Sequence, residues 1–260
     1  MTARNFLVRG LLAGLIAGLA AFGVAYFVGE SHVQTAIELE EAGSAAAPTD
    51  AAEETHSRDG EEKGTVVSRH NQRTWGLLTG TLGVGVALGG IVALVSAGVV
   101  GRLGRLTPGQ STAFVAFAGF VSVALVPFLK YPASPPAVGN AETIGSRTGL
   151  YFLYLLISVA VAVASVVLAN RLWRDRGAYV ALLAGGSLFL VVTVVSGQLL
   201  PTVNELGDFP ADILWYFRRA ALLTQATMWG VIGVALVGLT RPLYQRDLAD
   251  AERRELASSL

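Results

Sequence analysis

Six long runs of apolar residues, separated by short polar segments, dominate the pattern of this chain. They cover residues 6–28, 75–100, 111–129, 151–169, 179–200 and 220–240, and few of their side chains are charged. Each run is close to or longer than the roughly 20 residues that a helix needs to cross a hydrocarbon core of about 30 Å. The pattern predicts an all-α, polytopic transmembrane helix bundle of six spans, or of five if one run is interfacial or re-entrant.

The composition agrees with a membrane protein and excludes several kinds of site. Of the 260 residues, 53% are hydrophobic and 15% are charged, whereas soluble domains carry about a quarter charged residues. The formal net charge is zero, so nothing in the charge balance indicates a nucleic-acid partner. The chain has no cysteine, which excludes disulfides, thiolate metal ligands and cysteine catalysis.

The distribution of basic residues predicts how the spans are oriented. Arginines gather at the N-terminus, near 102–105, near 171–176 and after 240, which places both termini in the cytoplasm. The first apolar run exceeds the 7–15 residues of a signal peptide and no cleavage motif follows it, so we expect a retained span. Four basic residues fall on the predicted outer side, against this bias: Lys130, Arg147, Arg218 and Arg219.

These boundaries divide the chain into four parts. We expect a first span with a basic N-terminus over residues 1–28 and an acidic, partly disordered outer loop over 29–74. A five-span core should follow over 75–241, and a cytoplasmic tail over 242–260. Within the outer loop, residues 31–42 have the pattern of a short acidic helix. Residues 43–64 are rich in Ala, Glu, Asp, Ser and Thr without aromatic residues, a composition typical of disorder.

Glycine spacing predicts which spans touch. Gly10, Gly14 and Gly18 share one face of the first span. The second span repeats the four-residue spacing at Gly76, Gly80, Gly85 and Gly89. Small residues at this spacing let helix backbones approach closely, which favours a contact between the first and second spans. The alternative is the general enrichment of glycine in membrane helices.

Acidic residues and histidines at the outer ends of the spans are candidate metal ligands. If the first helix continues past Ser31, Glu30, Glu38 and Glu41 share one face, and His32 lies beside them. Carboxylate oxygen and imidazole nitrogen suit a borderline divalent cation such as cobalt, nickel or zinc. The alternative is a solvated acidic helix. Two further candidate ligands precede the second span and follow the fifth, His70 and Glu205.

Other polar residues at the same ends are candidates for a cation pathway or for structural roles. Asn204 follows Pro201 at the end of the fifth span, where an amide and an acid beside a broken helix are typical of a cation path. An ordinary capped turn uses the same residues. Prolines between 127 and 136 predict a stiff, non-helical connection. Three more residues are candidates for a cation pathway or for structural roles: Gln72, Lys130 and Arg218. No catalytic motif is present, so we do not expect an enzyme.

Several segments of the chain resemble one known family. They include FLVRGLLAGLIAGLAAFGVAYFVGE, AIELEEA, VSRHNQRTWGLLTG, LVPFLKYPASPPAVGNAETIGSRTGLYF, LLPTVNE and LWYFRRA. Together they resemble the CbtA family of probable cobalt transporter subunits, over about residues 5–241. The resemblance implies a multi-pass protein of the bacterial inner membrane that takes part in cobalt uptake for cobalamin. It also implies cobalt as substrate rather than as a permanently bound cofactor, and a small, single-span CbtB-like membrane partner.

Overall fold

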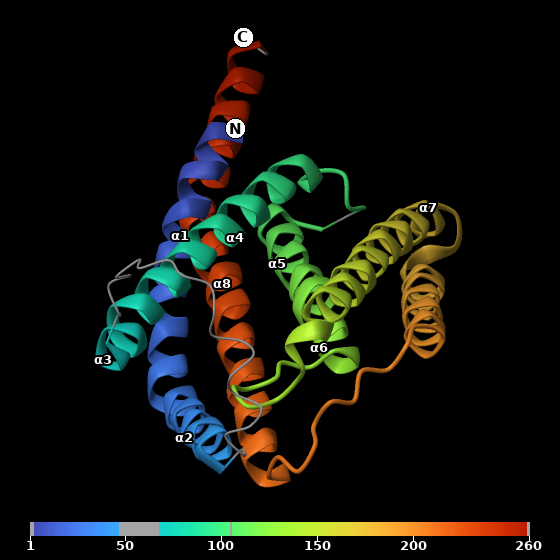
Figure 1. The fold of residues 1–260 in the computed structure, drawn as a ribbon. Helices are drawn as coiled ribbons and strands as arrows, with labels where there is room; N and C mark the ends of the chain where they lie inside the picture. The colour runs from blue at the N-terminus through green and yellow to red at the C-terminus, as the bar shows by residue number, and fades with distance from the viewer. Residues whose placement is uncertain (1–2, 47–67, 105, 259–260) are drawn as a thin grey trace.

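The computed structural model describes residues 3–46, 68–104 and 106–258, and their regular structure is entirely helical (Figure 1). Five helical segments within these residues are long and apolar enough to cross a membrane. They are Ala3–Gly43, Arg69–Val99, Pro108–Lys130, Ile144–Leu199 and Ala211–Ser258. The prediction of an all-α, polytopic membrane protein is confirmed.

The fourth segment, α7 (Ile144–Leu199), contains two of the six apolar runs. As a straight helix its 56 residues would extend about 84 Å, nearly three times the thickness of a hydrocarbon core. Gly177 interrupts it with φ 81° and ψ 171°, and the chain reverses direction there (Figure 1). Across the two halves, the Tyr154 hydroxyl donates to the Thr193 carbonyl oxygen at 2.9 Å. The five segments therefore contain six apolar helices, as the runs indicate.

The first segment continues well beyond the predicted span. α1 (Ala3–Val24) passes through a π-helical turn, η1 (Ala25–Gly29), into α2 (Glu30–Ala46). The predicted acidic helix is therefore confirmed. On the far side of the predicted outer loop, α3 (Arg69–Asn71) and the π-helical η3 (Gln72–Gly76) lead into α4 (Leu77–Val99). Both ends of that loop are helical, and most of the segment expected to be disordered lies outside the described residues.

Glycine builds the contact between α1 and α4. A methyl group added at Gly14 would meet the carbonyl oxygen of Gly85 and lie 2.7 Å from its carbonyl carbon. Gly10 and Gly18 likewise face backbone atoms of α4, whereas open space surrounds Gly80. The predicted contact between the first and second spans is confirmed, and the two backbones can approach this closely because no side chain separates them.

α8 (Ala211–Ser258) is the central helix of this packing, and its buried residues include Ile232 and Leu236. α8 contacts α1 on one side and α5 (Pro108–Gly119) on the other. α5 continues through the π-helical η4 (Phe120–Leu125) into α6 (Val126–Lys130). α7 packs instead against η4 and α6. The predicted tail, 242–260, continues α8 as helix to Ser258 with Pro242 inside it.

One expectation for the proline-rich stretch is wrong. Pro127 lies inside the helix, at the start of α6, and only the chain after Lys130 is non-helical. The π-helical turn of η4 ends two residues before this proline. Such local adjustments let a membrane helix accept a proline, because they satisfy the backbone groups that the proline leaves unbonded.

Candidate functional site

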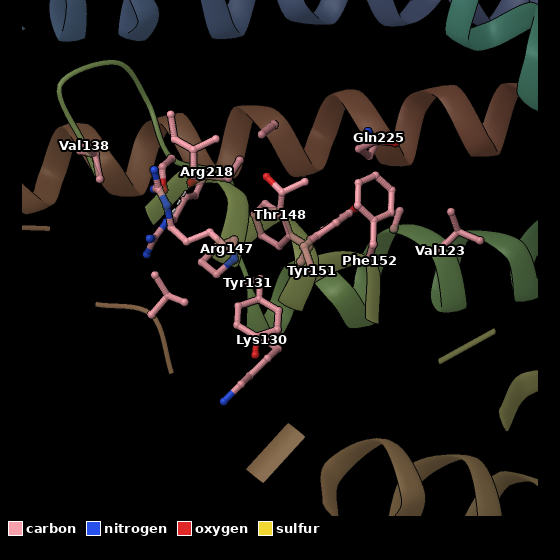
Figure 2. Close-up of a pocket in the computed structure, with 18 of the residues that line it drawn as sticks. Val123, Lys130, Tyr131, Val138, Arg147, Thr148, Tyr151, Phe152, Arg218 and Gln225 are labelled. Carbon is pink, nitrogen blue, oxygen red and sulfur yellow. Dashed lines mark hydrogen bonds between the residues drawn. The ribbon is translucent and has the colours of Figure 1, made fainter. Parts of the chain in front are cut away.

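A cavity of about 650 Å³ opens between α6, the start of α7 and the start of α8, beside the connections that follow α6 and α7 (Figure 2). Apolar and aromatic side chains make up most of its wall. The charged and amide-bearing residues that line it are Lys130, Arg147, Glu205, Arg218 and Gln225. Three of the four charged side chains are basic, so the cavity has a positive excess.

Glu205 joins the two connections beside the cavity. Its Oε2 accepts hydrogen bonds from the backbone N–H of Asn140 at 3.0 Å and from the Thr143 hydroxyl at 2.9 Å. The same oxygen lies 3.5 Å from Nε of Arg147. These interactions lower the pKa of Glu205 below its usual value. The hydrogen bond from the Asn140 N–H has the largest effect, the bond from the Thr143 hydroxyl comes next, and the charge of Arg147 adds to both. Glu205 is therefore an anion at neutral pH, held by three partners.

The guanidinium of Arg147 is held in place by the backbone of the connection. Its Nη2 donates to the carbonyl oxygen of Asn140 at 3.3 Å. Gly139, with φ 109°, passes so close that a methyl group there would lie 2.8 Å from Cζ of Arg147. This positive φ also favours glycine on conformational grounds. A glycine is therefore required here both for the turn and for the position of Arg147.

Two further cations complete the charged lining. Nε of Arg218, at the start of α8, donates to the carbonyl oxygen of Ala133 at 3.3 Å. Nζ of Lys130 lies 5.7 Å from the ring centre of Tyr131, and in Figure 2 it points away from the two arginines. The Tyr131 hydroxyl in turn donates to the carbonyl oxygen of Pro201 at 2.8 Å. These bonds make the two connections one polar cap over the cavity.

A second polar contact ties α2 to α3. Arg69 Nη2 forms an ion pair and hydrogen bond with Glu30 Oε1, and its Nε lies 3.4 Å from Gln34 Oε1. The Glu30 side chain is only 12% exposed. A carboxylate this well covered needs a partner for its charge, and Arg69 supplies one.

The six predicted metal ligands occupy different surroundings. His32 stacks on the Tyr216 ring with centres 5.4 Å apart. Glu38, Glu41 and His70 are exposed. Among residues 3–46, 68–104 and 106–258, no group of three or more His, Asp or Glu is placed to hold a metal ion. Glu30 and Glu205 contact arginines, as described above, and the metal-binding role of all six stays a prediction.

The residues predicted for a pathway are also separated. Lys130 and Arg218 line the cavity, whereas Asn204 is exposed beside it and Gln72 begins η3, three positions after Arg69 in the chain. Sequence reasoning missed Arg147 as a site residue. Its signal was present, since Arg147 was one of four basic residues that opposed the predicted charge bias.

Together, the long apolar helices and the charged cavity at one end define a multi-pass helical membrane protein with a polar cap. The family model described as "Probable cobalt transporter subunit (CbtA)" matches residues 3–241. This chain belongs to the CbtA family, which confirms the resemblance seen in its sequence. The family description is that of a transporter subunit rather than of an enzyme. Searches of curated proteins and of solved structures return no match.

Proposed function

We propose that this chain is a subunit of a bacterial inner-membrane system that imports cobalt for cobalamin synthesis. The observation that carries this proposal is the family match over residues 3–241. The long apolar helices agree with it, because import needs a body that crosses the bilayer and helices can do so. In this proposal the cavity end of the bundle faces outward and both termini face the cytoplasm. The cobalt ion is the substrate, and no cofactor is permanently bound.

Capture begins, in this proposal, on the acidic helix α2. Glu38 and Glu41 are exposed and lie one helical turn apart, so their carboxylates present one negative face. Such a face raises the local concentration of a divalent cation. His32 and His70 would add imidazole nitrogen, which cobalt accepts readily.

The two covered acids would act later in the path. Glu30 Oε1 and Glu205 Oε2 each face an arginine, so a cation that binds these oxygens must compete with Arg69 or Arg147. A doubly charged ion can compete for these carboxylates because its attraction to each is stronger than that of a single positive charge. Binding to these oxygens would offset the free-energy cost of removing water from the ion.

A small CbtB-like membrane protein would be the partner of this subunit. The alternative function is that of a non-transporting scaffold or accessory subunit of a metal transport complex. One observation favours the alternative. The charged cavity carries three cations against one acid, and such a surface repels a divalent metal ion.

The test measures cobalt, nickel and zinc accumulation in cells with and without the gene, in parallel. We expect cobalt accumulation to depend on the gene, and the double variant Glu38→Gln/Glu41→Gln to lower it several-fold at equal protein level. Glu252→Gln/Glu255→Gln is the matched control. Both residues are exposed, have the same spacing as Glu38 and Glu41, and lie near the C-terminal end of α8, away from α2. Equal loss in both double variants would contradict capture by α2, and gene-independent cobalt accumulation would contradict the function.

A further inference from the structure

The charges of the cavity lining do not balance. Glu205 lies beside Arg147, 3.5 Å from its Nε. No ion pair among the described residues includes Arg218, whose Nε donates to the neutral carbonyl oxygen of Ala133. Lys130 adds a further positive charge to the lining. Charges in a partly dehydrated space are costly unless an opposite charge is near, so this lining favours an anion.

The rest of the wall is apolar. The indole of Trp229, only 5% exposed, lies against Gly119, where an added methyl group would come within 2.9 Å of its Cη2 atom. Val123 and Phe152 extend the apolar lining. Figure 2 shows Arg147 and Arg218 at one end of the cavity and these two side chains at the other. The volume of about 650 Å³ is within the usual range for small-molecule sites.

We propose that this cavity binds an anionic head group, phosphate or carboxylate, carried on an apolar body. Arg218 and Arg147 contact the anion from the polar cap, where planar guanidinium groups suit the oxygens of either group. The apolar body lies along Val123, Phe152 and Trp229. A divalent cation is disfavoured beside Arg218 and Lys130, and Glu205, held by Arg147, is the one lining residue that this site shares with the proposed cobalt path. The ligand comes either from the membrane, as an anionic phospholipid, or from solution, as an amphiphilic anion.

Trp229 provides a reporter inside the cavity. The chain has four tryptophans, and replacing Trp75, Trp173 and Trp215 with phenylalanine leaves this one alone. The purified full-length protein, in a neutral detergent, is titrated with dioctanoyl phosphatidylglycerol, dioctanoyl phosphatidylcholine, hexyl phosphate and inorganic phosphate. The readout is the fluorescence of Trp229.

We expect a saturable change with phosphatidylglycerol or hexyl phosphate, at an affinity at least tenfold higher than with phosphatidylcholine. Tighter binding of phosphatidylglycerol identifies the membrane as the source, and equal or tighter binding of hexyl phosphate identifies a soluble anion. Inorganic phosphate should bind more weakly than hexyl phosphate, because it lacks an apolar body. Equal affinity for the anionic and zwitterionic lipids, or no saturable change with either anionic amphiphile, would overturn the proposal.

A pair of adjacent arginines supplies the matched test. Arg218→Gln should weaken binding of the anionic amphiphile about tenfold, as expected for the loss of one charge-assisted hydrogen bond. Arg219→Gln removes the same charge from an exposed neighbour that lies over the Tyr216 ring and should change affinity less than twofold. Lys130→Gln serves as a second cavity variant and should weaken binding several-fold. Unchanged binding in both cavity variants, or equal loss in the Arg219 variant, would refute the site.

Discussion

Gly14→Ala tests the close contact between α1 and α4. The added methyl group would lie 2.7 Å from the carbonyl carbon of Gly85 and 2.8 Å from Cα of Val86, whereas ordinary carbon–carbon contacts are about 3.5–4.0 Å. α1 must therefore retreat by about 0.7 Å or more. A gap of that size loses a quarter to a half of the dispersion energy across the contact, and overpacking typically costs about 1–3 kcal/mol.

The matched control is Gly83→Ala in α4, where nothing lies within 4 Å of the added methyl group. Both changes carry the same gain in helix propensity, about 1 kcal/mol, so their difference isolates the contact. Unfolding midpoints in mixed detergent–denaturant micelles measure both variants. We expect Gly14→Ala to be less stable than Gly83→Ala by about 1–3 kcal/mol. Equal midpoints would contradict a close contact between α1 and α4 at Gly14.

Three further outcomes follow from the same structure. Reporter fusions after Asn140 should report the outer side and fusions after Asp175 the cytoplasm, and reversal at both sites would contradict the charge-based orientation. Glu30→Arg should lower stability and Arg69→Glu in the same chain should restore most of it, since the exchange re-forms the ion pair; a double variant no better than the single one would contradict their coupling. Because the folded-state pKa of Glu205 is lowered from 4.5, its contacts stabilise the polar cap above that value and are lost as pH falls through the lowered pKa. The hydrogen-exchange protection factor of the amides around Asn140, which corrects for the intrinsic pH dependence of exchange, should therefore fall only in that acidic range, and a fall near neutral pH would contradict this assignment.

The elements that sequence predicted well are those set by periodicity and length. The six apolar runs form six helices, because each run is long enough to cross a bilayer. In the bilayer no water can bond to the backbone N–H and C=O groups, so a helix must satisfy them. The Gly10, Gly14 and Gly18 face identified its partner helix, because only small residues permit that approach. The continuation past Glu30 was also predictable, since no helix-breaking residue interrupts the chain there.

Features set by contacts between distant segments were not predictable. Glu205 lies more than sixty positions from Asn140 and Thr143 in the chain, and nothing in their local sequence indicates that they meet. The cavity lining depends on the same convergence, so Arg147 and Arg218 looked like separate exceptions to a charge rule. Pro127 was misjudged because a proline normally ends a helix, and the preceding π-helical turn is not visible in the composition.

The most direct test of the central claim is the initial rate of ⁵⁷Co²⁺ entry into cells that lack the gene and into the same cells carrying it. The proposed function predicts a saturable rate that requires the gene and falls several-fold in the Glu38→Gln/Glu41→Gln variant, while ⁶⁵Zn²⁺ entry is unchanged. An identical ⁵⁷Co²⁺ rate with and without the gene would contradict the assignment of this chain to cobalt import.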